Sequence, residues 1–321
     1  MASEFDLIDR YFKRPAPAGM LGVGDDCALF GVPPGMQVAT STDLLIEGRH
    51  FFPDVDPRAL GHKALAVNVS DLGAMGARPI GCLLGLALPA IDAAWLAAFA
   101  EGFHGLATAS GCPLIGGDTT GSALGVAISV TVFGAVAPTQ ALRRDGARPG
   151  DQVWVSGTLG AADIAYRLLS GQMPADASLL AATRGALEWP QPRHALGQAL
   201  GGVASAAIDI SDGLLQDLGH ILKASGVGAQ LHYADLPVAP ALAGIDPARL
   251  RHALLGGGDV YELCFIAPPE RADAVRAAAA AAGVAVTPIG QITSAAGLAV
   301  LGPDGQPDLD LPRGFDHFST R

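Results

Sequence analysis

The chain has 321 residues, a length typical of two domains, and 50% of them are hydrophobic, which allows a sizeable buried core. Its formal net charge of −11, with no locally basic face, argues against a nucleic-acid partner and against binding to anionic membranes. Two long uncharged stretches, 119–142 and 277–303, are interrupted by glycine and proline. We therefore expect them to be buried segments of a soluble protein, with no membrane partner.

The amino terminus is acidic and carries no apolar signal-peptide segment. The four cysteines are widely spaced and form no Cys-x-x-Cys pair, so buried free thiols in a reducing compartment explain them better than disulfides or zinc. We therefore expect a cytoplasmic location. The cysteines are Cys27, Cys82, Cys112 and Cys264.

Helix signals recur along the chain, beginning with Ser3 and Asp6, which resemble a capping box before an apolar turn. Each further helix has an acidic or hydroxyl cap before an apolar face, a glycine at its end, or both. These helices are predicted from Asp56 to Ala77, from Asp92 to Gly111, from Ser211 or Asp212 to Gly226, and from Glu270 to Gly283.

Apolar runs between these helices predict strands, and the two kinds of element mix in both halves of the chain, as in α/β or α+β layers. A polar, turn-rich stretch at 141–151 marks the junction. We predict an α/β domain at 1–140 and an α+β domain at 150–321. The predicted strands cover 37–42, 80–88, 124–136, 151–156, 207–210 and 261–266.

Aspartates repeatedly follow an apolar run and precede a small residue, which predicts a position at a strand end or a helix mouth. One such aspartate alone is most often a helix cap or an Asx turn. Six sites with few Lys or Arg nearby favour a cation, because a buried carboxylate needs a counter-charge or hydrogen-bond donors. Mg²⁺ prefers such oxygen ligands and is often shared with substrate phosphates. The sites are Asp25 with Asp26, Asp43, Asp71, Asp118, Asp209 with Asp212, and Asp259.

Other kinds of site are missing from the sequence. It contains no Walker A loop, no Gly-x-Gly-x-x-Gly before a helix, no pair of histidines at metal-binding spacing and no Gly-x-Ser-x-Gly elbow. A polyphosphate would be repelled by so many carboxylates unless metal ions came between them.

These motifs, in this order, resemble the thiamine-monophosphate kinases, of the superfamily that includes aminoimidazole ribonucleotide synthetase and selenophosphate synthetase. The resemblance runs from Glu4 to Phe318. It is most specific in the segments Gly24–Ala28, Ser41–Asp43, Glu47–Phe51, Ser70–Ala77, Gly116–Thr119 and Asp209–Leu214.

The resemblance implies direct, Mg²⁺-assisted transfer of the γ-phosphoryl group of ATP to thiamine monophosphate, the last step of thiamine diphosphate biosynthesis. It also implies a two-domain fold in which the N-terminal strands join those of a partner in a homodimer. No general base is needed, because the acceptor phosphate is already ionised; several Mg²⁺ ions and Arg144 would neutralise charge.

The resemblance also assigns roles to individual residues of this sequence. The metal ligands would be Asp26, Ser41, Thr42, Asp43, Asp71, Asp118, Asp209 and Asp212. ATP would contact Gly117, Asp118, Arg144 and Ser211, and thiamine monophosphate would contact His50, Asp259 and Phe315. From the residues alone, Arg144 also suits a solvated junction, His50 a structural histidine and Phe315 an anchor in the core.

The sequence departs from the family at one motif. The family usually has Gly-Gly-Glu-Asp-Tyr-Glu, whereas this chain has Asp259 and Val260 in place of the central Glu and Asp. The first acid is one methylene shorter and the second is lost. We expect weaker binding of thiamine monophosphate, with the ATP and metal sites intact.

Two alternative functions remain. One is a sister enzyme that uses ATP and Mg²⁺ on another acceptor. The hydrogenase-maturation relatives have a C-terminal cysteine, which this chain lacks. The selenophosphate synthetases have a reactive cysteine or selenocysteine in a glycine-rich segment, whereas Cys27 follows a double aspartate. The other is an inactive nucleotide-binding dimer, which only the change at Asp259 and Val260 supports.

Overall fold

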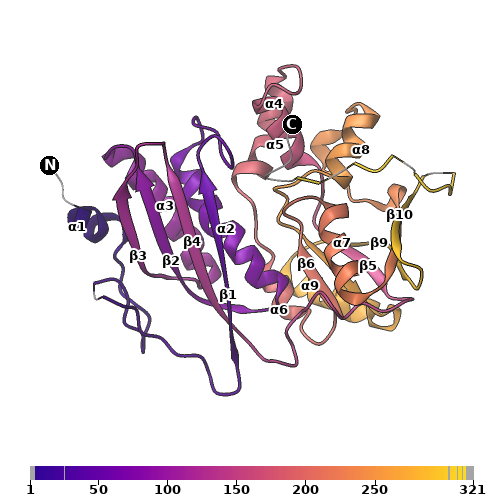
Figure 1. Ribbon diagram of the computed structural model, residues 1–321, viewed down its shortest axis with the longest axis horizontal. Coiled ribbons are helices and arrows are strands. Elements are labelled where there is room, and N and C mark those ends of the chain that lie inside the picture. Colours follow the sequence, from indigo (N-terminus) through magenta and orange to yellow (C-terminus); the bar gives the residue numbers. More distant parts are fainter. Residues whose placement is uncertain (1–3, 25, 303, 309, 313, 316–321) are drawn as a thin grey trace. The chain divides into compact units, whose positions relative to one another are not determined.

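The structure is a computed structural model that describes residues 4–24, 26–302, 304–308, 310–312 and 314–315. The chain forms two compact units (Figure 1). The N-terminal unit comprises residues 1–72 and 77–138, and the C-terminal unit comprises residues 73–76 and 139–321. The chain thus passes into the C-terminal unit at the start of the polar stretch, while the domain limits at 140 and 150 stay a prediction.

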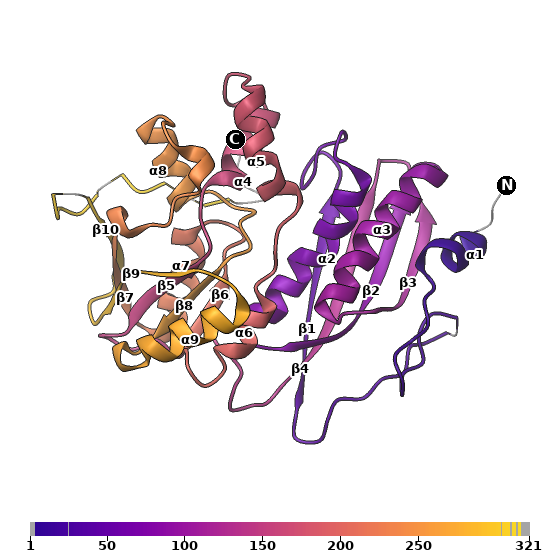
Figure 2. The same cartoon turned by 180° about the vertical axis from the view of Figure 1, so that it is seen from behind.

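The N-terminal unit is a four-stranded sheet of order β1-β4-β2-β3, in which β2 and β3 are parallel and the other neighbours antiparallel. Two long helices, α2 and α3, cover one face of this sheet (Figure 2). The elements are α1 (Glu4–Leu7), the π-helical turn η1 (Ile8–Phe12), β1 (Gln37–Ile46), α2 (Pro57–Ala74), β2 (Arg78–Leu88), α3 (Ala93–Ser110), β3 (Leu114–Gly121) and β4 (Ala127–Val136).

Helix α3 confirms the prediction made from its caps. The carboxylate of Asp92 accepts the N–H groups of Ala94 at 2.9 Å and Trp95 at 3.1 Å, and Gly111 ends the helix with a φ of 66°. Leu96, Phe99 and Phe103 on its inner side are fully buried. Helix α2 is buried on most of its surface, as its nearly continuous apolar sequence predicts.

The second face of the N-terminal sheet is open except where Phe30 packs on Phe133 of β4, with ring centroids 5.1 Å apart. Strand β1 alternates between the two faces, so that Leu45 is buried under the helices whereas Val38 and Leu44 are 51% and 55% exposed. No helix among the described residues covers this face (Figure 1). Large exposed apolar side chains on a sheet are typical of a surface that a partner covers.

The C-terminal unit is a six-stranded sheet of order β10-β7-β9-β5-β8-β6, in which only β10 and β7 are parallel. Its strands are β5 (Gln152–Ser156), β6 (Ala206–Asp209), β7 (Gly228–His232), β8 (Leu263–Ala267), β9 (Val286–Thr293) and β10 (Gly297–Leu301). Its helices are α4 (Ala161–Leu169), α5 (Ala177–Glu188), α6 (His194–Ala199), α7 (Leu214–Ser225), α8 (Pro247–Leu255) and α9 (Ala272–Ala282), with short 3₁₀ turns η2 (Tyr233–Asp235), η3 (Pro240–Leu242) and η4 (Pro269–Arg271).

Both faces of this second sheet are packed. Val153 and Val155 of β5 join the cluster that contains the apolar side of α7, whereas Trp154 between them joins the cluster of α6 and α9 on the other face. Trp154 stacks on Phe265 of β8 with ring centroids 6.3 Å apart. The alternation along β5 therefore divides the core into two layers.

The predicted helices and strands are present, with shifted ends, and several elements were not expected. Ser3 of the predicted capping box lies outside the described residues. All four cysteines are free; Cys27 is exposed and the other three are buried. Within the described ranges, no helix has the length and apolar character that a membrane crossing requires. The elements that the sequence did not predict are β3, β7, β9, β10, α4, α5, α6 and α8.

Candidate functional site

Three of the predicted metal ligands meet where β1 crosses α2. The hydroxyl of Ser41 donates to Asp71 Oδ2 at 2.5 Å. One helical turn earlier, the side-chain oxygen of the buried Asn68 accepts the N–H of Asp43 at 3.0 Å. Asp43 lies inside β1 and Asp71 lies inside α2, so the prediction that these aspartates lie at the ends of elements is wrong.

Thr42 lies on the opposite face of β1, because successive side chains of a strand alternate. Its hydroxyl donates to the carbonyl of Val130 at 3.0 Å and lies 2.9 Å from the hydroxyl of Thr131. The structure therefore separates this hydroxyl from Ser41 and Asp71, and its role as a metal ligand stays a prediction.

His50 lies in the turn that follows β1. The N–H of Ile46 donates to His50 Nδ1 at 2.9 Å, which places the proton of the neutral ring on Nε2. The ammonium group of Lys63 donates to the His50 carbonyl at 3.5 Å. The turn is thus fixed to both β1 and α2.

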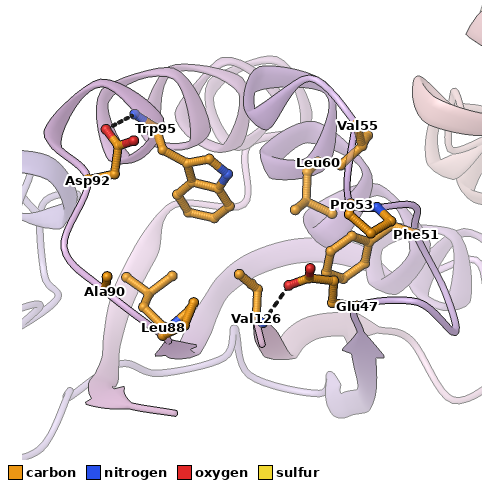
Figure 3. Close-up of a pocket in the computed structure, with 11 residues that line it drawn as sticks. Glu47, Phe51, Pro53, Val55, Leu60, Leu88, Ala90, Asp92, Trp95 and Val126 are labelled. Atoms are coloured by element: carbon orange, nitrogen blue, oxygen red, sulfur yellow. Dashed lines mark hydrogen bonds between the residues drawn. The ribbon is translucent and has the colours of Figure 1, made fainter. Parts of the chain in front are cut away.

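The same turn forms one wall of a cavity of about 260 Å³ (Figure 3). Phe51 and Trp95 lie on opposite sides of this cavity, and Trp95 stacks on Phe99 with centroids 5.1 Å apart. The Glu47 carboxylate accepts the N–H of Val126 at 2.8 Å at its edge. The cavity is mainly apolar, and its lining residues are Glu47, Phe51, Pro53, Val55, Leu60, Leu88, Pro89, Ala90, Asp92, Trp95 and Val126.

Gly117 and Asp118 lie in the middle of β3, an element that the sequence did not predict. Gly117 has a φ of 152°, and a Cβ atom there would lie 2.0 Å from the carbonyl oxygen of Leu84, so only glycine fits. A small cavity of about 30 Å³ beside these residues is lined by apolar side chains that include Ile8 and Phe12.

The two acidic positions of this sheet lie far apart within one chain. Asp43 is on the edge strand β1 and Asp118 is on the other edge strand, β3. Since β4 and β2 lie between them, the separation across three strand spacings is about 14 Å. Asp26 is exposed in the loop before β1, and Asp25 lies outside the described residues.

The predicted residues of the C-terminal unit gather around the start of α7. Asp209 ends β6 and is 4% exposed, and Ser211 and Asp212 follow it directly. The prediction that Ser211 or Asp212 caps α7 is wrong, because the helix begins at Leu214 and its N-cap is Gly213, which has no side chain to accept a hydrogen bond.

Asp217, in the first turn of α7, accepts three backbone N–H groups that precede the helix. Its Oδ2 atom accepts from Ser211, Asp212 and Gly213, each at 3.0 Å. The residue is 3% exposed. Burial raises the pKa of Asp217 to about 7, as does the charge of Asp212, although the three N–H groups stabilise the ionised form.

Asp259 and Phe315, which are distant in the sequence, join this loop through the backbone. The N–H of Asp259 donates to the Ser211 carbonyl at 2.8 Å, and the N–H of Phe315 donates to the Asp212 carbonyl at 2.9 Å. The side-chain amide of Gln216 donates to Asp212 Oδ2 at 3.2 Å and to the Phe315 carbonyl at 2.9 Å. Ser211, Asp212, Asp259 and Phe315 therefore form one cluster.

The segment that carries Asp259 has a strained backbone. Asp259 and Tyr261 have φ values of 57° and 55°, which are uncommon for residues other than glycine and cluster at functional sites. The Tyr261 hydroxyl donates to Asp259 Oδ1 at 3.0 Å. Val260, where the family has an acid, packs against the core of the unit. Glu262, which follows Tyr261, forms an ion pair with Arg193.

Arg144 lies outside this cluster. It is exposed, and its carbonyl accepts the Ser225 hydroxyl at 2.8 Å. The preceding carbonyl, of Arg143, accepts the N–H of Ala207 in β6 at 3.2 Å, so this segment runs beside the beginning of that strand.

The donor atoms at these positions suit a hard cation. Hydroxyl and carboxylate oxygens, as in Ser41, Asp43 and Asp71, are the ligands that Mg²⁺ prefers. Across the described part of the chain, however, no three His, Cys, Asp or Glu side chains gather closely enough to hold a metal ion. The acids occur in smaller sets, and their roles as ligands stay a prediction.

Comparison with known proteins explains this arrangement of motifs. Family models of the AIR synthase related proteins match residues 24–136 (N-terminal domain) and 148–302 (C-terminal domain). The thiamine-monophosphate kinase of Escherichia coli K12 is 43% identical, covering 99% of this chain and 98% of that protein.

Solved structures agree. The thiamine-monophosphate kinase of Stenotrophomonas maltophilia has a TM-score of 0.83 at 41% identity, covering 91% of this chain and 93% of that one. AaThiL complexed with AMPPCP and TMP has a TM-score of 0.77 at 32% identity, covering 90% of this chain and 89% of that one. With its two-domain AIR synthase-like fold and this identity over nearly its whole length, the chain belongs to the thiamine-monophosphate kinase family.

Proposed function

We propose that this protein transfers the γ-phosphoryl group of ATP to thiamine monophosphate, giving thiamine diphosphate and ADP. The 43% identity to a thiamine-monophosphate kinase over the full chain carries this proposal. AaThiL, related over nine-tenths of the chain, is complexed with AMPPCP, an ATP analogue, and with TMP. We also propose a cytoplasmic location, where ATP is available and thiols such as the four free cysteines stay reduced.

In the proposed reaction, a phosphate oxygen of thiamine monophosphate forms a bond to the γ-phosphorus while the bond from that phosphorus to the β,γ-bridging oxygen breaks. The acceptor oxygen is ionised at neutral pH, so the chain need not remove a proton. Its residues position the two anionic substrates and balance their charge. Bound Mg²⁺ would neutralise the phosphate oxygens.

Two sets of oxygen ligands would hold these ions. Ser41, Asp43 and Asp71 form the set of the N-terminal unit, in which Ser41 donates to Asp71 and Asn68 holds the backbone of Asp43. Asp209 and Asp212 form the set of the C-terminal unit, beside Ser211, the proposed ATP contact. We further propose that Asp26, Thr42 and Asp118 contribute ligands, that Gly117 contacts ATP, and that the Arg144 guanidinium binds phosphate oxygens.

The cavity next to His50 is our candidate for the ring end of thiamine monophosphate. Phe51 lies one residue after His50 and faces Trp95 across an apolar space of about 260 Å³, which suits a flat heteroaromatic ring. His50 Nε2, the protonated nitrogen of the neutral ring, would donate to the substrate. Asp259 and Phe315 complete the proposed contacts with this substrate.

We propose that two copies of the chain form a homodimer through the open face of the N-terminal sheet. The exposed Val38 and Leu44 would be buried there. If the two sheets close into a barrel with the twofold axis along the barrel, β1 of one copy comes beside β3 of the other, which would bring Asp43 and Asp118 of different copies to one seam. This arrangement offers a reason why these acids lie at opposite edges within one chain.

Size-exclusion chromatography with light scattering tests the dimer. Leu44→Lys places a charge on the open face and should yield a monomer. The control Leu124→Lys changes a side chain that is 95% exposed in the turn before β4, and it should remain dimeric. Equal masses for the two variants would contradict the proposed interface.

A coupled assay for ADP release tests the function. We expect turnover that requires thiamine monophosphate and stops when EDTA removes divalent cations. Asp71→Asn should lower turnover about 100-fold or more, because the proposed role of this carboxylate is to bind Mg²⁺ through its negative charge. Helical content should not change. The exposed Asp273→Asn is the matched control.

Three outcomes separate the candidate functions. Turnover only with thiamine monophosphate supports the kinase, and turnover only with another acceptor supports a sister enzyme. ATP binding without turnover on any acceptor would support the inactive binding protein and refute the proposal.

A further inference from the structure

A buried carboxylate outside the predicted ligand set holds the loop that bears Ser211 and Asp212. Asp217 Oδ2 accepts three consecutive backbone N–H groups, those of residues 211, 212 and 213, at 3.0 Å each. Three equal contacts to one oxygen fix the backbone of the loop at three successive points. A displaced loop would leave this buried oxygen without partners, which is energetically costly.

The loop is also packed closely against other segments of the unit. Gly213 has a φ of 127°, and a Cβ atom there would lie 2.8 Å from the backbone of Gly256. The Ser211 and Asp212 carbonyls accept the N–H groups of Asp259 and Phe315 at 2.8 and 2.9 Å. A shift of the loop on the Asp217 side is therefore transmitted to every member of the cluster.

An ordinary helix cap would not need this arrangement. A cap residue precedes its helix and accepts an N–H group of the first turn. Asp217 lies inside the helix and accepts N–H groups that precede the first turn, so its bonds orient the loop more than they stabilise α7. The side chain that they orient is that of Asp212, which is also contacted by Gln216, the residue before Asp217 in the helix.

We propose that Asp217 is a positioning residue that sets the geometry of Ser211 and Asp212 toward ATP and Mg²⁺ through the loop backbone. This inference rests on the proposed function. It predicts that the reach of the side chain at position 217 matters more than its charge. A displacement of about 1 Å at a reacting site typically lowers the rate by about 100-fold.

Three substitutions separate reach from charge. Asp217→Asn keeps an oxygen at the same reach and removes the charge, Asp217→Glu keeps the charge and extends the reach by one methylene, and Asp217→Ala removes the acceptor. Asp151→Asn and Asp151→Ala are matched controls, because Asp151 is also buried in this unit and accepts the Arg148 N–H at 3.1 Å and the Ser205 hydroxyl at 3.0 Å.

The measurements are kcat/KM for ATP, the Mg²⁺ concentration that gives half-maximal turnover, and Tm. We expect Asp217→Asn to stay within about tenfold of the unaltered protein, while Asp217→Glu and Asp217→Ala lose about 10- to 100-fold in kcat/KM and need more Mg²⁺. The Asp151 variants should lower Tm without changing the Mg²⁺ requirement. If Asp217→Ala does not fold, the order of the Asn and Glu variants still decides.

Two results would overturn the inference: Asp217→Glu more active than Asp217→Asn, or Asp217 variants that match the Asp151 variants in Mg²⁺ requirement. Asp212→Asn, measured in parallel, shows which proposal fails. If Asp212→Asn leaves turnover and the Mg²⁺ requirement unchanged, the proposed ligand set is wrong. If it impairs both while the Asp217 variants do not, only the positioning role is wrong.

Discussion

Substituting Arg193 by methionine should destabilise the C-terminal unit by removing one partner of a buried ion pair. Arg193 donates from Nε to Glu262 Oε2 at 2.7 Å and from Nη2 to Oε1 at 2.5 Å. The Glu262 side chain is only 9% exposed and that of Arg193 23%. The pKa of Arg193 is raised by Glu262, whose contacts outweigh the opposing effect of burial. Methionine keeps most of the apolar stem and removes the charge.

The expected loss in the free energy of unfolding depends on the hydrogen bonds that Glu262 keeps in the variant. Breaking a buried ion pair by removing one partner costs about 3–5 kcal/mol, because the other charge stays buried. The Ser156 hydroxyl still donates to the Glu262 carboxylate, so we expect the lower end of this range, about 3 kcal/mol. For a unit of this size, that corresponds to a Tm lower by about 6–12 °C.

Thermal unfolding followed by circular dichroism measures the change, with Arg143→Met as the control. Arg143 also forms two hydrogen bonds to one carboxylate, that of Asp145, but their side chains are 68% and 44% exposed. An exposed pair contributes at most about 1 kcal/mol. If the Arg193 and Arg143 variants lose the same stability, burial does not govern this ion pair and the reasoning is refuted.

Three further predictions concern other parts of the chain. Gly117→Ala should lower Tm and raise KM for ATP, since its Cβ atom meets the backbone of β2, whereas Gly121→Ala on the same strand meets nothing within 4 Å; equal effects would contradict the clash. The double change Asp259→Glu with Val260→Asp should lower KM for thiamine monophosphate and also lower Tm, because Val260 packs against the core; an unchanged KM would refute the expected weak binding. Burial, together with the charge of Arg14, lowers the pKa of His104 from 6.5, so the unfolded chain binds its proton more readily and stability falls as the pH drops below about 6.5. In a plot of Tm against pH, His104→Gln should make this fall less steep. If the fall is unaltered, His104 is not the group that causes it.

Sequence patterns predicted the elements whose limits are marked by local chemistry. Helix α3 has both a capping aspartate and a terminal glycine, and each acts within one turn of the chain. Strand β3 was missed because Gly116, Gly117 and the residues after them are typical of a turn. They lie in a strand because β2 pairs with them, which is a tertiary contact that no short pattern contains.

The cluster around α7 shows the same limit. The motif Asp209–Leu214 marks the loop, but the hydrogen bonds that bring Asp259 and Phe315 to it span long stretches of sequence. The role of Asp217 could not be predicted from the sequence, because an aspartate in the first turn of a helix is common and favourable in any soluble protein. Gly213 at the N-cap provides no side-chain acceptor for the first turn, but the three N–H groups that Asp217 accepts precede the helix, so no capping rule points to Asp217.

The three N–H groups before α7 would by themselves form a cradle for an anion, as glycine-rich loops do in many nucleotide-binding proteins. Here the protein's own carboxylate fills that cradle, so the loop cannot offer its amides to a triphosphate. The loop itself adds a further carboxylate, that of the half-buried Asp212. If this loop binds the triphosphate, as we propose, cations would have to lie between its carboxylates and the phosphate oxygens, and binding would then depend on divalent ions.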